Sequence, residues 1–437
     1  MKKILLGMLA TLAAALLITP KFVGGGIQSA AADTLRAMVP PNLRDSLTIE
    51  STELQHGWFT SHARLQVSLE ALDRISPKPV VLNLDLDIRH GPLLFTPVGV
   101  RVGAAFARIV PSLQGFDLPG PEASIELAGS DPLLTLFAGF DNSMELGLDA
   151  DRFTAGYRDS RLAAEGLRAR SQIFADLSNR AQASIDAVTT VGPGLDLAME
   201  NLTATGWRSD ITRTLSASEA GVSVSSLVSS APLAMDLDSL QIDYRLSDNE
   251  NSPADLDMNQ QVRVAHIDWD LPVDSLDWQL QISQLNRKLL NSYSELIRQA
   301  STPADLNLDQ ASATLTGLGR EFLVRLAREP FDLHSSLQLG AYNGGHDLQL
   351  SINWQGLPYL TDIEAFEPGA ALNALVVSVN LDADEAALMN SPFAQTVTDY
   401  RALLEIAGGR VRARITMGDG QLTLNDETFP LRQFVNF

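Results

Sequence analysis

Apolar and polar residues alternate strictly from Leu82 to Arg89, within the segment from Pro79 to Pro92. A β-strand points successive side chains to opposite faces, so this segment has one apolar face and one charged face. Gly91 and Pro92 end it, because glycine permits a positive φ and proline has no N–H for a further ladder bond. We predict that the apolar row is buried and the charged row exposed. The apolar row is Leu82, Leu84, Leu86 and Ile88, and the other is Asn83, Asp85, Asp87 and Arg89.

The same period of two returns along most of the chain, separated by turn residues. One apolar and one polar face, repeated many times, favours an antiparallel sheet over βαβ units. The clearest apolar rows are Leu65-Val67-Leu69, Leu195-Leu197-Met199, Leu240-Ile242-Tyr244, Leu276-Trp278-Leu280-Ile282, Leu348-Leu350-Ile352-Trp354 and Leu375-Val377-Val379-Leu381. Hairpin turns are predicted at Asn343-Gly344-Gly345 and at Gly418-Asp419-Gly420.

A helical period replaces this alternation in a few places near the C-terminal end. The segments predicted as helices are Leu285 to Ala300, Leu318 to Ala327 (ended by Pro330), Asp384 to Met389, and Gln395 to Ile406. A last short amphipathic turn is predicted from Leu431 to Val435. These helices look too short to cover the whole apolar side of a long sheet.

The patterns together predict an α+β protein that is mainly β. A long curved antiparallel sheet carries a few amphipathic helices, and an N-terminal transmembrane helix anchors it. The predicted organisation is a signal-anchor over residues 1–23, a hinge and short helix over 24–45, an antiparallel β body over 46–283, and an α+β part over 284–437 that continues the sheet.

The N-terminus has the form of an export signal. Lys2 and Lys3 precede an apolar run that continues to Val23 with Lys21 as its only charge, about the length needed to cross a bilayer. A small-residue cleavage site at Ala30 to Ala32 lies well downstream, so we favour an uncleaved anchor over a cleaved signal. The two lysines would keep the short N-terminus in the cytoplasm and place the body outside it.

Charge and composition exclude several classes. The formal net charge of −21 over 437 residues speaks against sequence-independent nucleic-acid binding, which needs clustered Lys and Arg. The chain has no cysteine, which excludes disulfides, thiolate metal sites and thiol catalysis. With 45% hydrophobic residues the chain can bury a sizeable core.

No catalytic, metal or cofactor signature is present, and we predict a protein that is not an enzyme and binds no cofactor. The six histidines show no ligand spacing, and His56 and His90 precede turn glycines, where capping of backbone groups is the favoured role. The acidic loop from Asp248 to Asp257 carries Pro253 where an EF-hand needs glycine, so it is interpreted as solvated.

A positive stripe stands out near the C-terminus. Arg410, Arg412 and Arg414 share one face of a predicted strand in this acidic chain. Cross-strand pairing with Asp or Glu is the favoured interpretation. The functional alternative is an anionic partner or a lipid head group.

Several segments resemble the YdgA/YihF-like family of bacterial envelope proteins. They are His56-Gly-Trp-Phe-Thr-Ser61, His90-Gly91-Pro92, Asp419-Gly-Gln-Leu-Thr-Leu-Asn425 and Pro430-Leu-Arg-Gln-Phe-Val435, in matching order and approximate spacing. Asp426 departs from the glycine typical of the family. The resemblance implies a single-pass anchor in the bacterial inner membrane and a periplasmic body, and it implies no known activity.

Three function classes remain. The first is a non-enzymatic envelope protein that binds lipid or another apolar ligand on its sheet. The second is a structural or interaction scaffold of the envelope with a closed β core, including a homodimer. The third, and the least favoured, is a hydrolase. The residues predicted to line the ligand site are Leu276, Trp278, Leu280, Ile282, Leu348, Leu350, Ile352 and Trp354.

Overall fold

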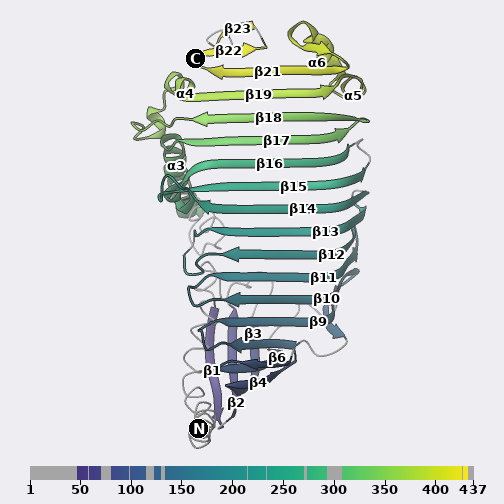
Figure 1. Ribbon diagram of the computed structural model, residues 1–437, viewed down its shortest axis with the longest axis vertical. Coiled ribbons are helices and arrows are strands. Elements are labelled where there is room, and N and C mark those ends of the chain that lie inside the picture. The colour runs from purple at the N-terminus through teal and green to yellow at the C-terminus, as the bar shows by residue number, and fades with distance from the viewer. Residues whose placement is uncertain are drawn as a thin grey trace, which may run out of the picture. The chain divides into compact units, whose positions relative to one another are not determined.

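The computed structural model describes residues 47–57, 59–69, 80–97, 99–114, 123–128, 133–213, 215–232, 234–269, 273–292, 308–425 and 427–431. The chain divides into two compact units, Met1–Thr214 and Leu215–Phe437. The fold is mainly β, as the alternation predicts, and each unit is built on antiparallel strands (Figure 1). The predicted boundary between residues 283 and 284 lies inside the second unit, near the end of a strand, and stays a prediction.

The first unit contains strands β1 to β12. Their bounds are β1 Leu47–His56, β2 Thr60–Leu69, β3 Val80–His90, β4 Leu93–Thr96, β5 Gly99–Val102, β6 Ala105–Gln114, β7 Ala123–Ala128, β8 Leu133–Ala138, β9 Met144–Tyr157, β10 Ser160–Ile173, β11 Asn179–Gly192 and β12 Leu195–Arg208. The antiparallel pairs run β1–β2, β2–β3, β3–β6, β6–β8, β8–β9, β9–β10, β10–β11 and β11–β12. Strand β7 pairs with the second half of β9, and β8 pairs with its first half.

The core of the first unit lies on one face of β3. Leu84, Leu86 and Ile88 are buried, and Asp85 and Asp87 are exposed, so the predicted face assignment of this strand is confirmed. Buried Ala105, Ala107 and Ile109 of β6 pack with these residues. Gly91 comes after the strand where no side chain fits, because an added Cβ would lie 1.6 Å from the carbonyl oxygen of Gly103.

Strands β4 and β5 form a separate two-stranded ribbon. The stretch from Pro92 to Pro111 is only partly apolar, and none of the apolar rows named from the sequence falls in it. The structure places β4, β5 and most of β6 in this stretch. The prediction missed them because adjacent apolar residues such as Leu93 and Leu94 hide the period of two.

The second unit is a ladder of long strands. Their bounds are β13 Ser218–Ala231, β14 Met235–Asp248, β15 Asp255–Trp269, β16 Val273–Asn286, β17 Phe331–Ala341, β18 Gly344–Trp354, β19 Leu375–Asp384, β20 Glu405–Ala407, β21 Arg410–Gly418, β22 Gln421–Leu424 and β23 Glu427–Pro430. Consecutive strands from β13 to β19 pair antiparallel, and β21 pairs with β19. On its other side β21 pairs with β20 and β22 (Figure 1).

Helices lie at the two ends of these strands in Figure 1. Helix α3 (Leu308–Arg328) is at one end, and α5 (Glu385–Met389) and α6 (Ala394–Asp399) are at the other. The remaining short helices are η2 (Ile363–Ala365), α4 (Pro368–Ala374) and η3 (Arg401–Leu403). The predicted helices near Leu318 and Asp384 are confirmed. Of the helix predicted from Leu285, residues 287–292 are helical and 293–300 lie outside the described residues.

The helix predicted from Gln395 to Ile406 is wrong in its second half. Helix α6 ends at Asp399, a 3-10 turn comes next, and Glu405–Ala407 forms β20. Strand β20 pairs with the start of β21, so the Gly408-Gly409 turn closes a hairpin. Both glycines have positive φ, which favours glycine. Tertiary pairing here overrides an apolar pattern that is too short to separate helix from strand.

Candidate functional site

The candidate site is the apolar face of the second unit, which extends across eight strands. Residues directly opposite each other in an antiparallel ladder share a face, so the strand registers define rows across the sheet. Two middle rows run Val222-Ile242-Val262-Trp278-Leu337-Leu348-Leu381-Ala413 and Ala220-Tyr244-Gln260-Leu280-Ser335-Leu350-Val379-Ile415. Two flanking rows run Val224-Leu240-Val264-Leu276-Leu339-His346-Ala383-Val411 and Ser218-Leu246-Met258-Ile282-Leu333-Ile352-Val377-Met417.

All eight residues predicted to line the ligand site lie on this face. Strands β16 and β18 are not neighbours, because β17 lies between them and contributes residues such as Leu333 and Leu337. Trp354, at the end of β18, pairs with Phe331 and Leu375. The predicted site does not include β17, although the alternation of this strand is clear. Alternation shows which side chains share a face of one strand, but it does not show which strands are neighbours.

The middle of the apolar face is partly open to solvent. Leu348 has 37% of its surface exposed, and Leu350, Trp278 and Leu280 are half-buried. The fully buried residues belong mostly to the flanking rows, among them Val264. The apolar face therefore differs from a core packed between two layers.

Helices cover the two ends of this face and leave its middle open. At one end the indole nitrogen of Trp354 donates to the carbonyl oxygen of Ala327 in α3, at 3.2 Å. At the other end Ala387 of α5 is buried beside Ala383 and Gly344, and a Cβ on Gly344 would lie 2.6 Å from that of Ala387. Asp384 caps α5 by accepting from the amide of Ala387 at 2.9 Å.

Trp278 and Ser335 on the apolar face bond to each other, whereas the buried Nδ1 of His346 in a flanking row has no hydrogen-bond partner among the described residues. The indole nitrogen of Trp278 donates to the hydroxyl of Ser335 at 3.0 Å. Burial raises the pKa of the Tyr244 hydroxyl, which is the effect of an apolar surrounding on a group that would become an anion. These residues leave few groups to orient a polar ligand, so the face suits an apolar one.

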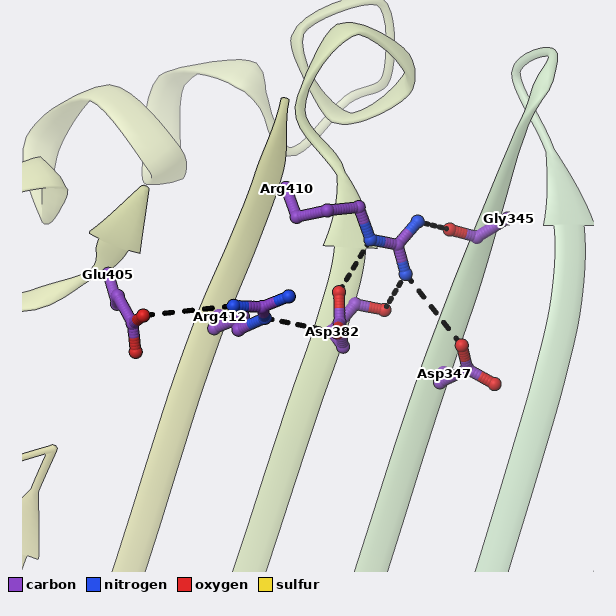
Figure 2. Close-up of polar contacts among 6 residues, drawn as sticks. All are labelled: Gly345, Asp347, Asp382, Glu405, Arg410 and Arg412. Carbon is purple, nitrogen blue, oxygen red and sulfur yellow. Dashed lines mark hydrogen bonds and ion pairs between the residues drawn. The ribbon is translucent and has the colours of Figure 1, made fainter. Parts of the chain in front are cut away.

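Arg410 and Arg412 of β21 belong to the opposite, polar face and are paired there (Figure 2). Arg410 Nε lies 2.6 Å from Asp382 Oδ1, and Arg412 Nε lies 3.1 Å from Asp382 Oδ2. Asp347 and Glu405 lie at 3.7 and 3.8 Å from Arg410 and Arg412. The hydrogen bond from Arg410, opposed by desolvation and reinforced by Arg412, lowers the pKa of Asp382. The cross-strand pairing expected from the sequence thus holds for Arg410 and Arg412.

Arg414 is placed differently from its two neighbours. Its exposed side chain lines an open depression of about 600 Å³ on the polar face, together with Gln349, Asn380 and Asn425. Asn425 accepts from the amide of Arg414 at 2.8 Å and donates to the carbonyl oxygen of Leu403 at 2.6 Å. This asparagine therefore ties the end of β22 to β21. Anion binding by the three arginines stays a prediction.

The histidines and the acidic loop carry structural contacts. The side chain of His90 is buried with its Nε2 2.8 Å from Ser61 Oγ, and backbone capping by His56 and His90 stays a prediction. In the acidic loop, Asp257 accepts from Asn249 and from the amide of Gln284. Within the described residues, no group of three or more His, Asp or Glu side chains is arranged to hold a metal ion.

One protein-family model matches nearly the whole chain. The family model described as "Bacterial protein of unknown function (DUF945)" matches residues 1–432. The chain belongs to this family. No curated protein and no solved structure matches it. Membership in DUF945 assigns no activity, and the resemblance to the YdgA/YihF-like proteins stays a prediction.

The anchor predicted for this DUF945 chain, residues 1–23, lies outside the described residues. Among the helices that the structure does describe, none has the length and apolar character needed to cross a membrane.

Proposed function

We propose that this protein is a non-enzymatic lipid-binding protein of the bacterial cell envelope. Its N-terminal segment tethers it to the inner membrane, and its body lies in the periplasm. Acyl chains bind on the apolar face of the second unit. The observation that carries the proposal is the partly open and mostly apolar middle of that face, across eight strands, where the Trp278 indole is already bonded to Ser335.

The chemistry of the face supports an acyl chain over a protein partner. Protein interfaces concentrate their binding energy in aromatic and arginine anchors that fill matching pockets. The middle rows here are mostly aliphatic, as at Val262, Leu337 and Leu381, and their two aromatic residues, Tyr244 and Trp278, are half-buried within the sheet. A polymethylene chain needs no register and gains about 25 cal/mol per Å² of apolar surface removed from water.

The location rests on the N-terminal pattern and on the resemblance to the YdgA/YihF-like envelope proteins. Lys2 and Lys3 before the apolar run favour export of the rest of the chain. Family membership adds that the relatives are bacterial. A tether beside a membrane would keep an exposed apolar face close to its source of lipid.

The test uses one substitution on each face of β18 in the full-length protein. Leu348→Glu places a charge in the middle of the apolar face, and Gln349→Glu places the same charge on the polar face. Because Leu348 is already partly exposed, the variant should fold. A photoreactive fatty acid is crosslinked to each protein, and the labelled peptides are identified by mass spectrometry. Crosslinking of lipid around the predicted membrane anchor is the same in both variants, so it does not affect the comparison between them.

We expect crosslinks in β16 to β18 for the wild type and for Gln349→Glu, and the loss of most of them for Leu348→Glu. The proposal is refuted if all three proteins are labelled equally and only outside these strands. A wild-type dimer that carries no lipid and becomes monomeric with Leu348→Glu would support instead the scaffold with a closed β core. Sedimentation of the same samples distinguishes these outcomes.

A further inference from the structure

The ribbon of β4 and β5 in the first unit has two unlike faces. Its register pairs Leu93 with Val102, Leu94 with Arg101, and Phe95 with Val100. Directly opposed residues share a face, so Leu94 and Arg101 lie on one side and the other four residues on the opposite side. We call the side of Leu94 and Arg101 the inner face of the ribbon and the opposite side its outer face.

The inner face holds the ribbon against the rest of the first unit. Leu94 is 1% exposed and packs with Phe106 and Phe137. The Arg101 guanidinium lies 3.6 Å from the centroid of the Phe137 ring, and its Nη2 is 3.0 Å from Glu145 Oε2. The orientation of the ribbon is therefore set by packing, a cation–π contact and an ion pair.

The outer face is apolar and open. Leu93, Phe95, Val100 and Val102 have 55%, 67%, 61% and 66% of their surfaces exposed. A ribbon whose outer face meets only water would carry polar residues at these positions. Four large apolar side chains held together in this way form a patch of the kind that marks an interaction surface.

Further exposed apolar side chains lie at the same end of the sheet. The carbonyl oxygen of Phe59 accepts from the amide of His90, just before the ribbon, and Phe59 is exposed. The amide of Ala104, just after the ribbon, donates to the carbonyl oxygen of Ala138, two residues before exposed Phe140. The apolar patch thus belongs to one end of the first unit.

The ribbon itself carries no acidic residue. From Leu93 to Val102 there is no Asp or Glu, although the chain has a net charge of −21, and Arg101 is paired with Glu145 on the inner face. Arg89 Nη1 donates to the carbonyl oxygen of Phe95 at 3.0 Å, which places a guanidinium beside the outer face. An anionic lipid surface complements an apolar patch that has a cation beside it and no acidic residue of its own.

We propose that the outer face of this ribbon inserts into the interfacial layer of a phospholipid bilayer. Its four side chains offer no hydrogen-bonding group to a protein partner, and the hydroxyl of Thr96 is already bonded to the carbonyl oxygen of Gly99 at 2.8 Å. Shallow burial of apolar side chains with cations at the head groups is the usual mode of interfacial binding. This contact is independent of the ligand face in the second unit.

The test exploits the absence of cysteine from the chain. A bimane fluorophore is attached to Val100→Cys in the full-length protein, which is then reconstituted into vesicles of phosphatidylethanolamine and phosphatidylglycerol. The matched control is Val191→Cys on β11, a valine of the same unit that is 55% exposed. Nitroxide-labelled lipids are placed either in the vesicles that hold the protein or only in vesicles added afterwards.

We expect the probe at position 100 to lose most of its fluorescence to the nitroxide lipids, and the probe at 191 to keep it. Quenching by nitroxide lipids in the vesicles that hold the protein shows that the patch binds the protein's own bilayer. Quenching only by nitroxide lipids in the added vesicles shows that it binds an opposing membrane. Phe95→Asp should restore the fluorescence without unfolding the protein, since Phe95 is exposed. An unquenched probe at 100 overturns the proposal, as does a probe shielded before any lipid is added, because protein then covers the patch.

Discussion

The Oγ atom of Ser61 lies 2.8 Å from the Nε2 atom of His90, and both side chains are buried in the first unit. Strands β2 and β3, which carry them, are neighbours in the sheet. A buried polar group that loses its partner carries its full desolvation penalty. This hydrogen bond therefore stabilises the end of the sheet from which the β4–β5 ribbon projects.

We predict that Ser61→Ala destabilises the protein by about 1–3 kcal/mol, because it leaves a buried ring nitrogen of His90 without this partner. Urea unfolding measures the loss. The control is His62→Gln on the same strand, where an exposed histidine lies 2.5 Å from exposed Asp87. An exposed ion pair contributes about 0–1 kcal/mol, so the control should change the midpoint little. A larger effect from His62→Gln would contradict the burial assigned to Ser61.

The two faces of β3 should respond differently to substitution. Leu86→Asp buries a carboxylate against Ala107 and Ile109, at a cost on the order of 3 kcal/mol or more, and should unfold the first unit. Asp85→Ala removes an exposed ion pair with Arg64 and should cost at most about 1 kcal/mol. Circular dichroism with thermal unfolding compares the two. Similar unfolding midpoints would show that the faces are assigned wrongly.

Asp382 should give the second unit an acid-sensitive stability. Its hydrogen bonds to Arg410 and Arg412 hold its folded pKa below the ordinary value of 3.8. A depressed folded pKa contributes stability that is present above the unfolded pKa and lost as the pH falls below it. Asp382→Asn should therefore be less stable than the wild type at neutral pH, and the difference should shrink below about pH 4.

Unfolding midpoints measured from neutral to acid pH test this expectation. Asp347→Asn is the control, because Asp347 lies 3.7 Å from Arg410 whereas Asp382 bridges both arginines. A constant difference between Asp382→Asn and the wild type at every pH would show that the charge of Asp382 contributes nothing.

Gly91→Ala should destabilise the first unit by about 1–3 kcal/mol, because the new methyl group would meet the carbonyl oxygen of Gly103 at 1.6 Å. Gly345→Ala is the matched change in the second unit, where an added Cβ finds no atom within 4 Å. That variant should stay within about 0.5 kcal/mol of the wild type. Chemical denaturation of both proteins gives the comparison, and equal stability would argue against the close approach at Gly91.

The predicted anchor has its own test. If residues 1–23 remain on the protein and span the bilayer, the full-length chain should stay in the membrane fraction after a carbonate wash. Apolar contacts with lipid survive high pH, whereas peripheral electrostatic contacts do not. A mature N-terminus at Asp33 would show that the segment is a cleaved signal.

Local patterns determined which elements form and which way their side chains face. The alternation from Leu82 to Arg89 predicts the two faces of β3, because side-chain parity along a strand depends only on neighbouring residues. The same holds for the turn at Asp419 and Gly420, both of which have positive φ. The helical segment predicted from Asp384 to Met389 likewise forms α5.

Only the tertiary structure decided which strands are neighbours and which apolar surfaces stay open. Strand β17 separates β16 from β18, and β20 exists because β21 pairs with it, although its own residues have an ambiguous period. Whether Leu348 or Phe95 is covered depends on a second layer that no local pattern specifies. Parity is a property of a few consecutive residues, whereas burial is a property of segments far apart in the chain, and this is why the sequence predicted the strands but not the exposed β4–β5 ribbon.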